Sequence, residues 1–181
     1  MLHYITTNQN KIDIAKKFLT PHEIFFEPQN IELTEIQSKD IKKVVENKAK
    51  QAYEIIKTPL FVNDHFWSIT ALNGFPGAYM KYMNEWLTPD DFLNLMKGKK
   101  NREAILTEAV CYIDESRIQT FLMQHKAVIL ESPKGKGLPA LRVISVSGDG
   151  LSIAEKLEKD PSAVDVYPIW DEFAKWYKSL G

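Results

Sequence analysis

The sequence of 181 residues lacks the features that mark several specialised protein classes. It has one cysteine, Cys111, so no internal disulfide can form, and a reducing compartment is expected. No N-terminal signal peptide is recognisable, and no apolar run approaches the ~20 residues that a membrane span needs. The net charge of −1 excludes a broadly basic surface for nucleic acid. We therefore expect a cytoplasmic protein that binds neither a membrane nor nucleic acid.

The composition is that of a folded chain. Hydrophobic residues make up 44% and charged residues 26%, which argues against disorder. There are no internal repeats and no low-complexity tracts. A chain of this length buries a substantial core, and we expect one domain over residues 1–181, with two lobes that are not independent domains. Cys111 falls within an alternating, strand-like run and is interpreted as a small buried residue, with catalysis as the alternative.

Hydrophobic periodicity predicts a mixed α/β fold. Thr88 before Pro89 and two acids is a typical helix start. The expected strands cover residues 2–6, 23–27, 60–62, 102–113, 117–130 and 141–146. The expected helices cover residues 10–19, a long segment that opens at 38–40, a segment from 88, 152–158 and 169–180. The last helix carries an exposed-looking aromatic set (Trp170, Phe173, Trp176 and Tyr177), for which core packing and a dimer surface are the two alternatives.

The segment at residues 6–11 has the pattern of an anion site. An apolar strand runs into Thr6, Thr7 and Asn8, and Lys11 follows in the first turn of an amphipathic helix. Backbone N–H groups and the dipole at a helix N-terminus favour negative charge. The segment lacks the glycine run of a Walker loop or a dinucleotide fingerprint. A polar turn with a solvated lysine therefore stays an alternative.

Two lysines occupy positions that periodicity assigns to apolar faces. Lys48 lies four residues after Val44 in the long second helix, and Lys11 shares a face with Ala15 and Phe18. A lysine on such a face must extend to solvent or find an anionic partner, because burying an unpaired charge is costly. A shared anionic ligand would satisfy both lysines.

Acidic residues supply the matching charge. Asp64 follows the apolar run 60–62, at the expected carboxyl end of a buried strand, where open α/β sheets bind ligands. Glu35 lies in a polar linker before the second helix. Carboxylates beside a phosphate site are typical ligands of Mg²⁺, although a turn aspartate and a surface glutamate would give the same pattern. His65 has no second histidine or cysteine at ligand spacing, which argues against a transition metal.

Three sequence blocks together resemble the inosine triphosphate pyrophosphatase family. They are Thr6–Lys11, Phe61–Asp64 and Asn73–Lys81, the last with the specific pattern G-x-P-G-x-Y-x-K. Order and spacing match over roughly the first hundred residues. The later half matches more faintly, through Asp149-Gly150 and Ala154-Glu155.

The resemblance implies a fold and a reaction. The fold is an elongated mixed sheet with flanking helices, two lobes around a nucleotide-binding cleft, and usually a homodimer. The reaction is Mg²⁺-dependent hydrolysis of a non-canonical nucleoside triphosphate to the monophosphate and pyrophosphate. Carried over by position, Thr6, Thr7, Asn8, Lys11 and Lys48 would hold the triphosphate. Glu35 and Asp64 would bind the metal, and Asp64, with Lys11 and Lys48, would carry the catalysis.

The sequence also departs from the family pattern. Asn63-Asp64-His65-Phe66 stands where the family has Glu-Asp-Thr/Ser-Gly, so one acid beside the metal becomes a neutral amide. The base-reading motifs expected near residues 140–143 and 165–167 are absent. A base site without its polar groups loses discrimination, so we expect altered or relaxed base preference. Phe66, Arg142 and Tyr167 are candidates for a new base pocket.

Three interpretations remain open at this point. The first is an active nucleoside triphosphate pyrophosphatase with altered base preference. The second is a hydrolase of another phosphate-containing nucleotide on the same scaffold. The third is a catalytically reduced nucleotide-binding protein, which the neutral Asn63 favours and the retained Asp64, Glu35, Lys11 and Lys48 disfavour.

Overall fold

The described residues, 1–146, 148–160 and 168–181 of a computed structural model, form a mixed α/β fold around one sheet. The strand order is β2-β1-β3-β5-β6-β7, with β4 paired to β3. Strand β1 pairs in parallel with β2 and β3, whereas β4 and β7 are antiparallel to β3 and β6. The fold class predicted from periodicity is confirmed. The strands are β1 (Leu2–Ile5), β2 (Phe26–Gln29), β3 (Leu60–Ile69), β4 (Pro76–Gly77), β5 (Glu103–Ile113), β6 (Ile118–Ile129) and β7 (Ile144–Ser145).

The contacts divide the chain into two compact units. The first unit comprises Met1–His65, Glu108–Met123 and Tyr167–Gly181. The second unit comprises Phe66–Thr107 and Gln124–Val166. Each has its own hydrophobic core.

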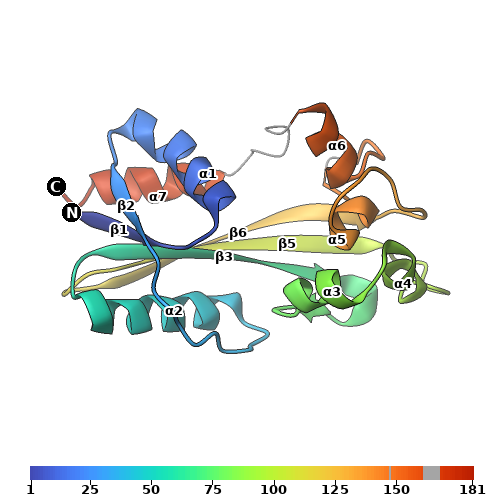
Figure 1. The fold of residues 1–181 in the computed structure, drawn as a ribbon, viewed down its shortest axis with the longest axis horizontal. Helices are drawn as coiled ribbons and strands as arrows, with labels where there is room; N and C mark the ends of the chain where they lie inside the picture. Colours follow the sequence, from blue (N-terminus) through green and yellow to red (C-terminus); the bar gives the residue numbers. More distant parts are fainter. Residues whose placement is uncertain (147, 161–167) are drawn as a thin grey trace. The chain divides into compact units, whose positions relative to one another are not determined.

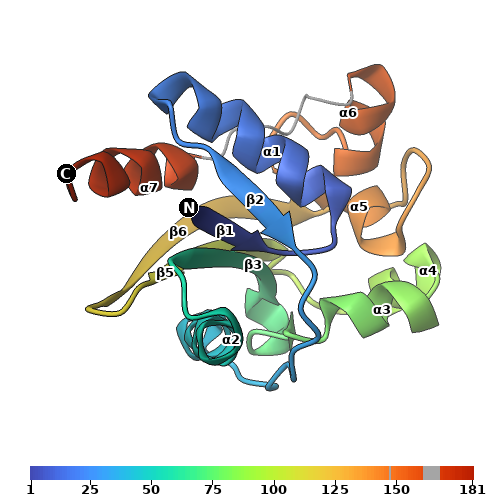
Figure 2. The ribbon, with the colours of Figure 1, turned by 60° about the vertical axis from the view of Figure 1, so that its left-hand side comes forward.

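In the first unit, helices cover both faces of the strands. Helices α1 (Gln9–Leu19) and α7 (Pro168–Lys178) lie on one face and α2 (Ile41–Ile56) on the other (Figures 1 and 2). A 3₁₀ helix, η1 (Thr20–His22), follows α1. Asp40 caps α2, because its carboxylate accepts a hydrogen bond from the backbone N–H of Lys42 at 3.0 Å. The predicted apolar stripe of α2 is buried over most of its length, but Ile55, near its end, is 60% exposed.

An aromatic core joins α7 to the central strands of this unit. Tyr4 of β1 stacks on Phe61 of β3, with ring centroids 4.5 Å apart, and Trp170 contacts both rings edge-on. Phe173 is fully buried beside them. Trp170 and Phe173 are therefore not exposed, although the sequence suggested that they were. Core packing, one of the two alternatives, is confirmed for these two residues.

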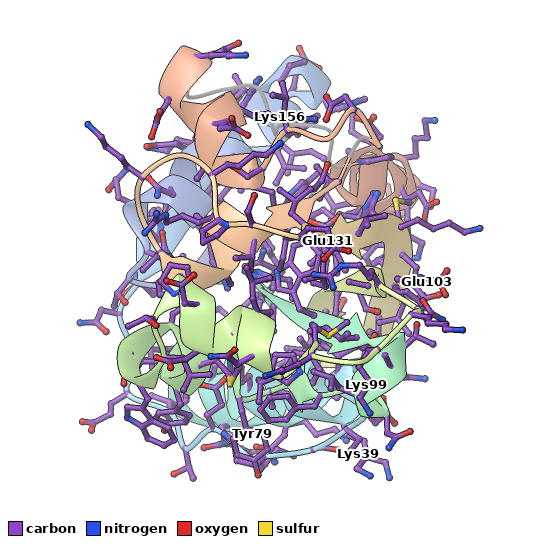
Figure 3. All side chains as sticks on the ribbon, turned by 90° about the vertical axis from the view of Figure 1, so that its right-hand side faces the viewer. Lys39, Tyr79, Lys99, Glu103, Glu131 and Lys156 are labelled. Atoms are coloured by element: carbon purple, nitrogen blue, oxygen red, sulfur yellow. The ribbon has the colours of Figure 1, made fainter. Side chains whose placement is uncertain are left out.

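In the second unit, short helices pack against the parts of β3, β5 and β6 that fall within Phe66–Thr107 and Gln124–Val166. Thr88 and Asp91 form a reciprocal capping box at α4, which confirms the predicted helix start. Tyr79, at the start of α3, stays 49% exposed (Figure 3). The helices of this unit are η2 (Thr70–Leu72), α3 (Met80–Trp86), α4 (Pro89–Asn94), α5 (Pro139–Val143) and α6 (Ile153–Lys159).

Three expected strands need correction. The strand expected at 141–146 is mostly α5, because Pro139 fixes a helical φ at the first position, and only Ile144–Ser145 is extended. The strand expected at 23–27 begins at Phe26, since Glu23 ends η1 with a left-handed φ of 57°. The short strand expected at 60–62 continues to Ile69. It therefore includes Asn63 and Asp64, two residue types that are depleted in strands.

Candidate active site

The predicted anion site lies where β1 ends and α1 begins. Strand β1 pairs with β3 at His3–Leu60 and Tyr4–Phe61 and stops at Ile5, whereas β3 continues. The turn is held locally: the Thr6 hydroxyl accepts from the Asn8 N–H at 3.2 Å. Asn8 in turn caps α1 by accepting from the Lys11 N–H at 3.3 Å. Thr7 is exposed beside them. The turn therefore presents the N-terminus of α1, as predicted.

Asp64 lies inside β3 and not after its end, which corrects the sequence prediction. The stretch of β3 that contains it lies beyond the two residues that pair with β1. The Lys11 ammonium donates to the backbone carbonyl of Asn63 at 3.2 Å and lies 3.7 Å from Asp64 Oδ1. The carboxylate is thus reached by a cation from the helix that follows β1.

Lys48 approaches the same carboxylate from α2. Its Nζ lies 2.5 Å from Asp64 Oδ2 and 2.8 Å from Glu35 Oε1. The Lys48 and Asp64 side chains are 17% and 14% exposed, whereas Glu35 is 52% exposed. The structure therefore brings together the four charged residues singled out from the sequence. Both lysines have anionic partners instead of extending alone to solvent.

The lysines control the protonation of Asp64. Burial by itself raises the pKa of this carboxyl, but the ammonium groups of Lys11 and Lys48 outweigh burial and hold the pKa at about 2. Burial lowers the pKa of Lys11, and the attraction of Asp64 offsets only part of this effect. The pKa of Lys48 is raised, because Asp64 and Glu35 together outweigh its burial. At neutral pH, Asp64 is therefore an anion held between cations.

A contact that sequence reasoning missed fixes the neighbouring Asn63. The buried hydroxyl of Tyr4 donates to Asn63 Oδ1 at 2.5 Å. Burial, with the nearby Asp64 charge, raises the pKa of Tyr4, so the hydroxyl keeps its proton. The only signal in the sequence was a tyrosine hydroxyl within the short strand that precedes the polar turn. Its partner lies 59 residues away.

The acidic residues fit a magnesium ion. Within the described ranges, no three His, Cys, Asp or Glu side chains converge as a metal cage. Asp64 and Glu35, however, already direct one oxygen each at a single cation, the Lys48 ammonium. Mg²⁺ is commonly held by one or two carboxylates and completes its shell with water and substrate phosphates. The donor set matches this mode better than an all-protein cage.

Two of the three residues predicted for the base pocket, Phe66 and Arg142, belong to the second unit. Phe66 is buried in β3. Arg142 lies in α5, and no hydrogen-bond partner among the described residues reaches its buried Nε. Tyr167 lies outside the described residues. Their role in base recognition stays a prediction.

Cys111 is fully buried in β5, as predicted. Burial raises the pKa of its thiol to about 11, so the reactive thiolate is scarce at neutral pH. A structural role is consistent with both observations.

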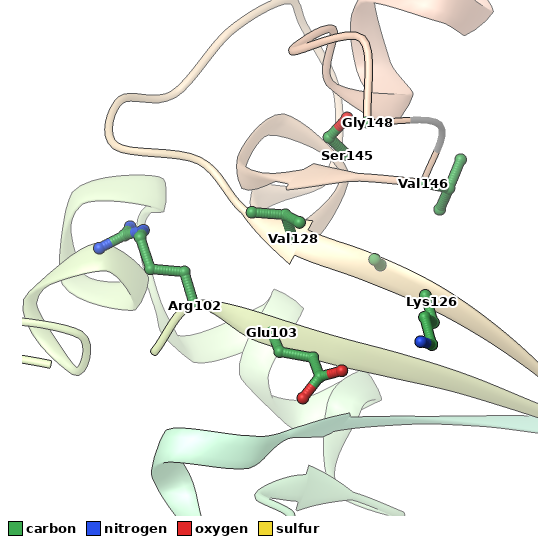
Figure 4. Close-up of a pocket in the computed structure, with 8 residues that line it drawn as sticks. Arg102, Glu103, Lys126, Val128, Ser145, Val146 and Gly148 are labelled. Carbon is green, nitrogen blue, oxygen red and sulfur yellow. The ribbon is translucent and has the colours of Figure 1, made fainter. Parts of the chain in front are cut away.

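A cavity of about 490 Å³ in the second unit contains none of the predicted site residues (Figure 4). At the rim of the cavity, the Arg102 guanidinium donates hydrogen bonds to the carbonyl oxygens of Ile129 and Leu130. It also forms an ion pair with Glu131, with Nε and Oε1 3.2 Å apart. Side chains of Glu103, Lys126, Val128 and Ser145 line the rest.

The G-x-P-G block forms a tight turn that folds back on β3. Gly74 and Gly77 have φ of 89° and 56°, which side chains with a Cβ rarely adopt. Pro76 and Gly77 then pair with Ser68 and Trp67. The glycines of this block are therefore required by the backbone itself.

A family model decides the relationship: the model of the Ham1 family matches residues 2–138. The chain belongs to the Ham1 family. It is 28% identical to a dITP/XTP pyrophosphatase of Methanopyrus kandleri over 179 residues, covering 97% of this chain and 95% of the relative. It is 32% identical to a dITP/XTP pyrophosphatase of Saccharolobus solfataricus, covering 72% of this chain and 68% of the relative. It is 31% identical to inosine triphosphate pyrophosphatase 1 of Trypanosoma cruzi, covering 74% and 68%.

Solved structures show the same fold for this Ham1 family member. A HAM1 protein from Coxiella burnetii superposes with a TM-score of 0.81 at 17% identity, covering 99% of this chain and 100% of that chain. The Ham1 protein of Staphylococcus aureus gives 0.80 at 15% identity, with full coverage of both chains. The described residues include no helix that is long and apolar enough to cross a membrane.

Proposed function

We propose that this Ham1 family member is a Mg²⁺-dependent nucleoside triphosphate pyrophosphatase. It would hydrolyse a non-canonical nucleoside triphosphate to the monophosphate and pyrophosphate. Relatives named dITP/XTP pyrophosphatase and inosine triphosphate pyrophosphatase support the reaction class. The observation that carries the proposal is the Asp64 carboxylate held between Lys11 and Lys48 beside the N-terminus of α1.

The triphosphate would lie against the start of α1. Backbone N–H groups of the first turn, Thr6, Thr7 and the Asn8 amide offer neutral donors, and the helix dipole adds a favourable field. Lys11 and Lys48 add two full positive charges at the same place. Charge neutralisation and positioning carry most of phosphoryl-transfer catalysis, so this set is suited to hold the reacting group.

Glu35 and Asp64 would hold the magnesium ion. When bound, Mg²⁺ neutralises charge on the phosphate oxygens and helps to fix their orientation. Asp64 is ionised throughout the neutral range and would accept a hydrogen bond from the attacking water, which orients its oxygen toward phosphorus. The water oxygen would bond to the α-phosphorus while the bond from that phosphorus to the oxygen that bridges to the β-phosphate breaks. Pyrophosphate would leave with the electron pair of that bond, and the water proton would pass to solvent.

We further propose that base preference is altered or relaxed. This rests on the sequence, which lacks the family's base-reading motifs near residues 140–143 and 165–167. Phe66, Arg142 and Tyr167 remain the candidates for contact with the base. Assembly as a homodimer and a cytoplasmic location stay predictions.

Pyrophosphate release from a panel of nucleoside triphosphates tests the proposed activity. With Mg²⁺ present, release from inosine or xanthosine triphosphate is the expected result. Asp64→Asn should reduce the rate at least about a hundredfold, because a positioned acid contributes ~10²–10⁴-fold. Asp13→Asn is the matched control, since Asp13 is exposed on α1 and accepts a hydrogen bond from the Gln9 side chain.

A nucleotide-binding protein without turnover is the second candidate, and the neutral Asn63 favours it. Thermal stabilisation by nucleoside triphosphates with no pyrophosphate release would support that alternative and refute the pyrophosphatase. Asp64→Asn activity within a few-fold of the natural chain would remove Asp64 from the catalytic role.

A further inference from the structure

Lys48 occupies the position between the two proposed metal ligands. Its ammonium contacts Asp64 Oδ2 at 2.5 Å and Glu35 Oε1 at 2.8 Å, so each carboxylate directs an oxygen at it. A magnesium ion bound to the same two oxygens, at ~2.0–2.1 Å from each, would need the same space. The lysine and the metal therefore exclude each other at this point.

The charges of the cluster are balanced without a metal. Lys11 and Lys48 bring two positive charges, and Glu35 and Asp64 bring two negative charges. Free Mg²⁺ entering alone would leave Lys48, only 17% exposed, beside a new divalent cation and without its anionic partners. Burying an uncompensated charge is costly, so metal entry by itself is unfavourable.

A polyphosphate reverses this balance. Its negative oxygens at the N-terminus of α1 would give Lys48 new partners while the carboxylates turn to the metal. Lys11 is already beside that N-terminus, because it lies in the first turn of α1 and donates to the Asn63 carbonyl. The exchange keeps every charged group paired.

We propose that Lys48 competes with the metal for Glu35 and Asp64. The metal then enters only together with the polyphosphate. This inference rests on the proposed function, because it assigns the form in which that site takes its substrate. The substrate binds as the complex of metal and triphosphate. The free metal does not bind first, with the free nucleotide following. Lys48 thereby couples the two binding events, and each ligand tightens the binding of the other by the same factor.

A titration with Mn²⁺, followed by the electron paramagnetic resonance signal of the free ion, tests this coupling without turnover. In the natural chain, adding pyrophosphate should tighten Mn²⁺ binding to the protein by about tenfold or more, beyond Mn²⁺ bound by pyrophosphate alone. Lys48→Met should bind Mn²⁺ alone about tenfold more tightly than the natural chain does. Its gain from pyrophosphate should fall to a few-fold or less.

Lys42→Met is the matched control on the same helix. Lys42 is 54% exposed and lies 3.8 Å from Glu46, so its removal should leave Mn²⁺ binding unchanged. Equal or weaker Mn²⁺ binding by folded Lys48→Met would overturn the proposal. If that variant does not fold, the natural chain still decides, because tight Mn²⁺ binding without pyrophosphate would equally overturn it. Failure of the proposed function has a different readout, the absence of pyrophosphate release from every triphosphate tested.

Discussion

Asp64 should stabilise the folded chain in a pH-dependent way. Its pKa is lowered from 3.8 to about 2 by Lys11 and Lys48. A carboxyl whose pKa is lower in the folded state adds stability above its unfolded pKa and loses it as the pH falls toward the folded value. The contribution is therefore complete at pH 7 and is lost progressively as the pH falls from about 5 to about 1.

The size of this contribution follows from the shift. Each pKa unit corresponds to ~1.4 kcal/mol, so the lowered pKa is worth about 2 kcal/mol. Asp64→Asn keeps the shape of the side chain and removes the charge. Within the part of the chain that the structure describes, it also leaves the largely buried Lys48 with the half-exposed Glu35 as its remaining ion-pair partner. We expect the free energy of unfolding to fall by about 2 kcal/mol at pH 7.

Urea denaturation at pH 7, 4 and 2.5 measures this effect. The difference between the natural chain and Asp64→Asn should shrink steadily as the pH falls. Asp13→Asn makes the same change in charge at an exposed site and should alter stability by less than ~0.5 kcal/mol. A variant as stable as the natural chain at pH 7, or a difference as large at pH 2.5 as at pH 7, would refute the argument.

Two further substitutions probe the site and the core. Asn63→Asp adds a negative charge beside Asp64 without a change in shape. It should lower the Mg²⁺ concentration for half-maximal pyrophosphate release by about tenfold. An unchanged Mg²⁺ requirement, equal to that of the control Asn101→Asp, would contradict this. Phe173→Ala removes a fully buried ring and should lower the free energy of unfolding by about 3–5 kcal/mol in a denaturant titration. The control Phe25→Ala, at a side chain that is 72% exposed, should change the free energy of unfolding little. A loss of less than about 1 kcal/mol in Phe173→Ala would contradict the role of Phe173 in the core.

The features that depend on neighbouring residues could be predicted from the sequence. Asn8 caps α1 through a partner three residues away, and Thr88 does the same at α4. The periodicity of α2 placed Lys48 on its inner face, where the structure finds it beside Asp64. In each case the signal lies within one or two helical turns.

The features that depend on strand pairing could not be predicted. The apolar run ends at Val62, so the sequence predicted that the strand ends there, whereas β3 continues to Ile69. The hydrogen bond between Tyr4 and Asn63 depends on the register of β1 against β3, which no local pattern contains. The same holds for the position of Asp64 within the strand, where tertiary contacts override local propensity.

Because Asp64 lies within β3 and not on a loop, the residues on either side of it can change in evolution while the acid keeps its place. Successive residues of a strand point to opposite faces, and the backbone between them is fixed by its neighbours. Positions 63 and 65 can therefore exchange an acid for an amide, or a small residue for an imidazole, while the carboxylate between them stays in place. Substitutions at these two positions can therefore change the electric field at the Asp64 carboxylate, in evolution or by design, while the backbone around the acid stays the same.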